Sequence, residues 1–196
     1  MCVKKFLLIF VVAFVPLTIV VADDSEKKSA SKTVEFLSKD GSFLKKEFYD
    51  LPSVGGTYNR IDFQVLILTD LKNNEKYGCL RITTYYISSI MNTSANDSYI
   101  GTLDSDELDA CIVCFEKISS EITVTSALTY TEVEYKTRDG VKLGTFWNEA
   151  KSEWKTYIQT KSYSSHSMST VPSNKVSFLI GNLKQAKQMI AEKTAM

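Results

Sequence analysis

The sequence predicts an α+β domain: a largely antiparallel sheet of about seven strands with two amphipathic helices on one face. Alternating apolar and polar runs, separated by turn dipeptides, fill most of the chain and are typical of half-buried strands. Two apolar stripes at helical spacing, over 104–119 and from 172 onward, predict the helices. Each helix follows a run of strands, so the chain also divides into two halves, each a β-meander followed by a helix.

The first 22 residues have the three parts of a secretory signal peptide. Lys4 and Lys5 precede an apolar run over 6–21, and small Ala22 offers a cleavage site. We therefore expect cleavage after Ala22 and a secreted or periplasmic protein. The alternative is an uncleaved membrane anchor, although Pro16 interrupts the run and a span needs ~20 apolar residues.

Alternation and turn chemistry give the elements of the first half. Residues 23–32 carry no large apolar side chain and are predicted to form a flexible lead-in to a single domain over 33–196. Strands are predicted over 33–36, 42–49, 58–69 and 77–87. The Asp40-Gly41 turn and loops over 51–57, 70–75 and 88–98 separate them. Strand 58–69 is apolar on both faces, which places it centrally in the sheet.

The first long helix has clear start signals. Asp104 is predicted to cap its first turn, and Glu107 is placed to complete a capping box. Its buried face is predicted to consist of Leu108, Cys111, Ile112, Phe115 and Ile118. The pattern ends near Ser119.

The second half repeats the scheme with shorter elements. Strands are predicted over 122–136, 141–147 and 154–163, with a weak strand or a loop over 164–171. A helix then begins at Pro172-Ser173, with an apolar stripe at Val176, Leu179, Ile180, Leu183, Ala186 and Ile190. Segments 34–41 and 133–140 match in identity or type at six of eight positions, which suggests duplication. Any alternating strand before an Asp-Gly turn would match in the same way, so both interpretations stay open.

The charge balance argues against a nucleic-acid partner. The chain has 23 basic and 23 acidic side chains, whereas phosphate binding requires a clustered positive surface. A membrane partner is expected only if the leader is retained. Asn92 and Asn96 each begin an N-x-[ST] sequon in a polar segment, and glycosylation there depends on the host.

Three cysteines remain beyond the leader, and they leave several interpretations open. Cys111 and Cys114 form a C-x-x-C that falls two turns inside a capped helix, where nothing activates a thiol. Buried inert cysteines are the favoured interpretation. The alternatives are a disulfide from Cys79 to Cys111 or Cys114, or a redox-active pair.

No motif predicts a metal ion, a cofactor or a catalytic residue. His166 is the only histidine and lies in a serine-rich run, which favours an exposed polar residue. The acidic cluster around Asp104 fails the calcium-loop pattern and suits a helix N-terminus instead. The cysteines lack the second ligand pair that zinc needs.

Aromatic residues of the second half provide the one candidate binding surface. Trp147 and Trp154 flank a predicted turn and are expected to be cross-strand neighbours, with Tyr157 nearby. Paired tryptophans on an open sheet face suit a carbohydrate or an apolar partner, although strand aromatics also form cores. The sequence thus predicts an exported, non-enzymatic domain that binds a ligand or protein. The alternatives are a thiol-active exported protein and a membrane-anchored envelope protein.

Overall fold

The computed structural model describes residues 30–56, 59–90 and 93–195 and confirms the α+β class. Within these ranges, eight antiparallel strands form two sheets of four rather than one sheet of about seven. The first sheet contains β1 (Leu44–Val54), β2 (Ile61–Asp70), β3 (Glu75–Ile90) and β4 (Thr93–Asp104). The second contains β5 (Glu132–Lys136), β6 (Lys142–Asn148), β7 (Glu153–Gln159) and β8 (Met168–Val171). The α-helices are α1 (Lys32–Leu37), α2 (Leu108–Lys117) and α3 (Val176–Thr194).

Each sheet is a meander whose strands pair in chain order, and each is followed by a long helix. The predicted division into two meander-plus-helix halves is therefore present. The matching segments 34–41 and 133–140, which suggested a duplication, do not have the same structure. Residues 34–41 span α1 and the turn after it, whereas 133–140 span β5 and the Asp139-Gly140 turn.

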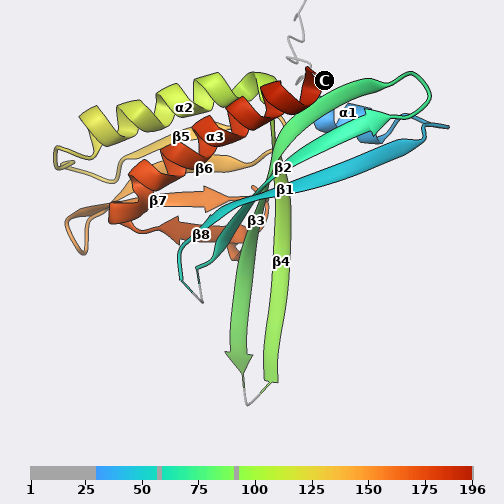
Figure 1. Cartoon of the computed structure of the whole chain (residues 1–196). Coiled ribbons are helices and arrows are strands. Elements are labelled where there is room, and N and C mark those ends of the chain that lie inside the picture. Colours follow the sequence, from blue (N-terminus) through green and yellow to red (C-terminus); the bar gives the residue numbers. More distant parts are fainter. Residues whose placement is uncertain (1–29, 57–58, 91–92, 196) are drawn as a thin grey trace, which may run out of the picture.

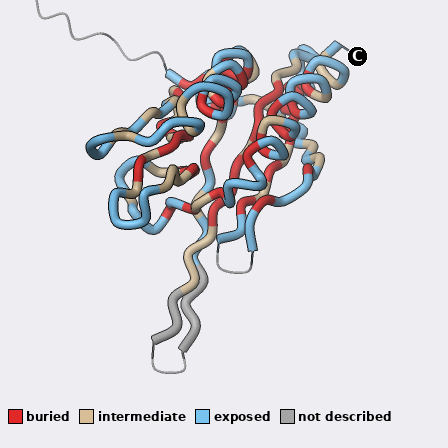
Figure 2. The backbone as a smooth tube through the Cα atoms, turned by 90° about the vertical axis from the view of Figure 1, so that its left-hand side faces the viewer, coloured by how far each residue is buried: buried red, intermediate tan, exposed pale blue. Residues whose placement is uncertain are grey.

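One apolar core joins the two halves. Helix α3 lies across one face of the first sheet, and α2 runs beside α3 on the side of β5 and β6 (Figure 1). The predicted helical stripes are buried, apart from Ile180, which is partly covered. Strand β2 lies between β1 and β3 as predicted. Figure 2 shows the buried residues concentrated between the helices and the sheets. Helices α2 and α3 thus complete a core to which both sheets contribute.

Buried polar side chains connect the sheets at their meeting point. Thr84 Oγ1 lies 2.8 Å from Thr160 Oγ1 and donates to the Ser167 carbonyl oxygen, also at 2.8 Å. All three residues are buried. Gly101 allows the close approach, because a Cβ there would lie 2.3 Å from Val141 Cγ2. The sheets therefore meet through side chains instead of a shared ladder.

The strand predicted over 33–36 is wrong, because this segment belongs to helix α1. Ser31 caps the helix, and Thr33 and Phe36 form its buried face, while Val34 is exposed. The apolar residues at 34 and 36 suggested alternation, but three residues cannot separate that pattern from one helical turn. The cap residue Ser31 lies within the segment 23–32 that was predicted to be the lead-in.

Other boundaries differ where backbone pairing overrides composition. The polar loop predicted over 88–98 is wrong: β3 continues to Ile90 and β4 begins at Thr93, so a long hairpin replaces it. Strand β1 continues to Val54 through a predicted loop, and β5 begins at Glu132 instead of residue 122. No helix in the described ranges is both long and apolar enough to span a membrane. The predicted signal peptide lies outside the described residues.

Asp104 links both halves through its buried carboxylate. It accepts hydrogen bonds from the backbone N–H groups of Lys32 at 2.8 Å and Thr33 at 3.0 Å, and from Thr33 Oγ1 at 2.6 Å. Arg138, in the β5–β6 turn, pairs with it at 3.0 Å. The predicted capping box with Glu107 is present. Burial raises the pKa of Asp104, but the Thr33 and Lys32 hydrogen bonds and the Arg138 charge outweigh it, so the pKa is lowered.

We expect Asp104→Asn to lower the free energy of unfolding by about 3–5 kcal/mol, because it removes the buried anion that accepts hydrogen bonds from Lys32 and Thr33 and pairs with Arg138. Urea denaturation of the variant and the parent protein measures this loss. Asp109→Asn is the matched control, since the Asp109 side chain is 71% exposed and exposed changes usually stay within about 0.5 kcal/mol. Equal losses in the two variants would contradict the assigned role of Asp104.

We also expect stability to fall in acid. Hydrogen bonds from Arg138 lower the pKa of Asp106 to about 2, against the effect of burial. The pKa of Asp104 is lowered as well. Unfolded aspartate titrates near ~3.9, so this stability is present above about pH 4 and lost as pH falls toward the folded values. Burial raises the pKa of Glu107, which opposes the trend. Urea midpoints at pH 6 and pH 3 should differ less in Asp104→Asn than in the parent.

Candidate functional site

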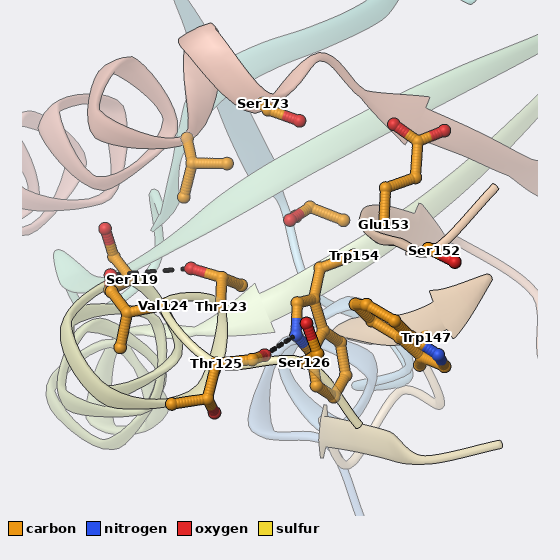
Figure 3. A pocket seen from close by; sticks show the side chains of 12 residues that line it. Ser119, Thr123, Val124, Thr125, Ser126, Trp147, Ser152, Glu153, Trp154 and Ser173 are labelled. Carbon is orange, nitrogen blue, oxygen red and sulfur yellow. Dashed lines mark hydrogen bonds between the residues drawn. The ribbon is translucent and has the colours of Figure 1, made fainter. Parts of the chain in front are cut away.

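A pocket of about 360 Å³ opens where the end of α2, the β6–β7 hairpin and the start of α3 meet. We call it the Trp pocket, because Trp147 and Trp154 line it side by side (Figure 3). Residues 123–126 form one wall, and Ser173 and Val176 lie at the α3 end. The two halves of the chain therefore both contribute to it.

The tight turn between β6 and β7 positions the two indoles. Trp147 and Trp154 are paired in the strand register, as predicted, and Ser152 completes the turn with φ of 51°. Their ring centroids lie 5.5 Å apart at an interplanar angle of 65°, an edge-to-face arrangement. Trp147 is 7% exposed and supports the fold, while Trp154 is partly exposed. Trp154 is therefore the indole available to a ligand.

Hydroxyl groups surround the indoles. The chain leaves α2 through a wide turn, η2 (Ile118–Ile122), and residues 123–126 then lie against Trp154. Trp154 Nε1 donates to the Thr125 carbonyl oxygen at 2.6 Å, which fixes the ring (Figure 3). The Ser119, Thr123, Ser126 and Ser173 side chains also line the pocket. The site combines an aromatic wall with several donors and acceptors.

Glu153 adds one carboxylate to the pocket lining. It pairs with Lys155 at 2.8 Å, and this hydrogen bond lowers the pKa of Glu153. The carboxylate is therefore an ionised hydrogen-bond acceptor at neutral pH. It has no second carboxylate beside it in the pocket lining, as paired acid–base catalysis would need.

Tyr157 lies outside the Trp pocket. Successive strand residues point to opposite faces, and Tyr157 follows Thr156, which does line the pocket. Tyr157 is 2% exposed and donates to Glu132 and Glu134 on the other face of the sheet. The predicted set of three aromatics is therefore divided between two faces, because the pairing places only Trp147 and Trp154 together.

The three cysteines are free thiols in the described part of the chain. Cys79 packs with Phe36 and Leu66 beneath α1, whereas Cys111 lies in the main core on the opposite face of the sheet. The sheet therefore separates the predicted partners of a Cys79–Cys111 disulfide. Burial raises the pKa of Cys79 to about 12, and it also raises the pKa values of Cys111 and Cys114. These surroundings disfavour the thiolate that redox chemistry requires.

The other residues that the sequence singled out are His166, the acidic cluster around Asp104 and the two sequons. His166 is exposed and stacks on Tyr86, with ring centroids 4.0 Å apart. The acidic cluster is occupied by Arg138, Lys32 and backbone donors. Asn92 lies outside the described residues, and the structure does not describe the side chain of Asn96.

Sequence reasoning missed the 123–126 wall of the Trp pocket. This segment was predicted to be the start of a strand, because Ile122, Val124 and the threonines favour β structure. It is instead irregular, and Val124, Thr125 and Ser126 are exposed. A run of small hydroxyl residues between a helix and a strand was the only available signal.

Comparisons with protein families, characterised proteins and solved structures gave no match to this chain. The chemistry of the described residues is therefore the basis for a functional proposal.

Thiol labelling tests the interpretation of the cysteines. In the native protein at pH 8, we expect partly exposed Cys114 to react slowly and Cys79 and Cys111 to react only on unfolding. Peptide mapping after labelling distinguishes them from Cys2. Fast labelling of Cys111 in the folded protein would instead support the thiol-active alternative.

Proposed function

We propose that this protein is an exported, non-enzymatic binding protein whose Trp pocket takes a small neutral ligand with one apolar face and several hydroxyl groups, such as a sugar. The observation that carries the proposal is the placement of Trp154 beside Trp147 within a ring of serine and threonine side chains. Aromatic rings stack on apolar faces, while hydroxyls and a carboxylate fix orientation.

The dimensions and lining of the pocket support a small ligand. A volume of about 360 Å³ is within the range of small-molecule pockets. Glu153 and the hydroxyls can accept hydrogen bonds from several sugar hydroxyls at once. Most of the lining serines and threonines are exposed, so their hydroxyls can bond a ligand that rests on Trp154. A neutral, hydroxyl-rich ligand therefore fits the site.

Export is part of the proposal and rests on the sequence. The charged start, apolar run and small-residue exit of residues 1–22 support a cleaved leader. N-terminal sequencing of the protein from its own host tests this directly. A start at Asp23 would support export with cleavage, and an intact N-terminus would favour the membrane anchor.

Intrinsic fluorescence offers a direct binding test, because both tryptophans of the chain line the pocket. We expect neutral mono- and disaccharides, titrated one at a time, to include one that changes the emission saturably. Trp154→Ala should lower the affinity for that sugar by about tenfold or more in calorimetric titration, and tenfold corresponds to ~1.4 kcal/mol of binding free energy.

Tyr163→Ala is the control, because Tyr163 is 85% exposed and lies outside the pocket. It should leave the affinity unchanged. Thermal unfolding of each variant separates lost binding from lost folding. A stably folded Trp154→Ala protein with full affinity would contradict the proposed site.

A further inference from the structure

The first sheet carries a second hollow, on the face opposite α3. Helix α1 covers one part of this face, where Phe36 packs on Leu66, Leu68 and Cys79. Beyond α1 the face is open and polar, with a groove of about 460 Å³. We call it the Arg81 groove. It lies on strands of the first half and shares no lining residue with the Trp pocket.

Three polar side chains form a row across the strands of this groove. The register places Asp50 beside Gln64 and Gln64 beside Arg81. Gln64 Nε2 donates to Asp50 Oδ1 at 2.7 Å, and Arg81 Nη1 donates to Gln64 Oε1. The amide of Gln64 is thus oriented by both neighbours. This row is preorganised before any ligand arrives.

The second arginine of the groove already has an acidic partner. Arg60 Nε donates to Asp62 Oδ1 at 2.6 Å, and Ser53 and Tyr85 donate to the same carboxylate at 2.6 and 2.7 Å. Burial raises the pKa of Asp62, but these three hydrogen bonds outweigh it and lower the pKa. Asp62 is therefore ionised and balances Arg60.

Arg81 differs, because no carboxylate in the described part of the chain forms an ion pair with it. Arg81 is a half-buried residue, and its Cζ lies 5.8 Å from the centre of the Phe48 ring. Only Nη1 has a hydrogen-bond partner among the described residues, and that partner is a neutral amide. A guanidinium has five N–H donors in a planar fork that matches a carboxylate. The guanidinium is thus held in place, and no carboxylate of the described residues pairs with it.

We propose that the Arg81 groove binds an acidic sugar, a uronic-acid type of residue, with its carboxylate on Arg81. The neighbouring groups decide between a sugar and a simple anion. Asp50 accepts hydrogen bonds and repels a polyanion, whereas sugar hydroxyls can donate to it. Gln64 and Thr83 offer further polar contacts in the same groove. A sugar ring with one carboxylate can place that carboxylate on Arg81 and donate from its hydroxyls to Asp50.

The test uses the full chain with three probes: glucuronate, glucose and glutarate. Glucuronate has the carboxylate and the hydroxyls, glucose only the hydroxyls, and glutarate only the carboxyl groups. We expect NMR titration to shift the Arg81 Nε–H and the Gln64 side-chain amide saturably with glucuronate, and at least about tenfold more weakly with the other two. The tryptophan emission should not change, which separates this site from the Trp pocket.

Arg81→Gln should weaken glucuronate binding at least about tenfold. Lys39→Gln is the matched control, because it also removes one positive charge, from an exposed residue outside the groove. If Arg81→Gln fails to fold, the shifts in the parent protein still locate the site. Equally strong titration of the Arg81 and Gln64 signals by glucose or by glutarate would overturn the acidic-sugar assignment, the latter in favour of acidic peptides. Absence of any shift at Arg81 and Gln64 would overturn the site itself.

Discussion

The buried carboxylate of Asp104 holds together segments that are far apart in the sequence. It ends β4, caps the turn that leads into α2, receives the first backbone N–H groups of α1 and pairs with Arg138 from the second half. Such a carboxylate costs desolvation energy, which its donors must offset. The entry into α2 and the position of the β5–β6 turn are therefore set by one ion, and both elements lead toward the Trp pocket.

The two halves follow one another in the sequence, but each packs against the other. Helix α3 ends the second half and packs on the first sheet, while the end of α2 supplies one wall of a pocket whose tryptophans come from the second. Neither half could bury its apolar face alone in this arrangement. The Trp pocket is consequently a property of the whole domain, whereas the Arg81 groove depends on the first sheet alone.

Long periodic elements were predictable because many residues agree on one pattern. The stripes of α2 and α3, the capping box at Asp104 and the central position of β2 are all confirmed. Short or polar segments were not predictable. Helix α1 depends on caps from a residue about seventy positions away, and the hairpin of β3 and β4 continues through residues whose composition favours a loop. Their backbone pairing carries no side-chain signature.

The fold class, the helical faces and the pairing of Trp147 with Trp154 could be derived from the residues alone, since each follows from local periodicity or from a short turn. The three-dimensional arrangement was needed to show that the strands form two sheets and that Tyr157 faces away from the tryptophans. It was also needed to show that no carboxylate among the described residues pairs with Arg81. These features depend on which distant surfaces meet. Local spacing fixes the direction of a side chain relative to its own strand, but not what lies opposite it.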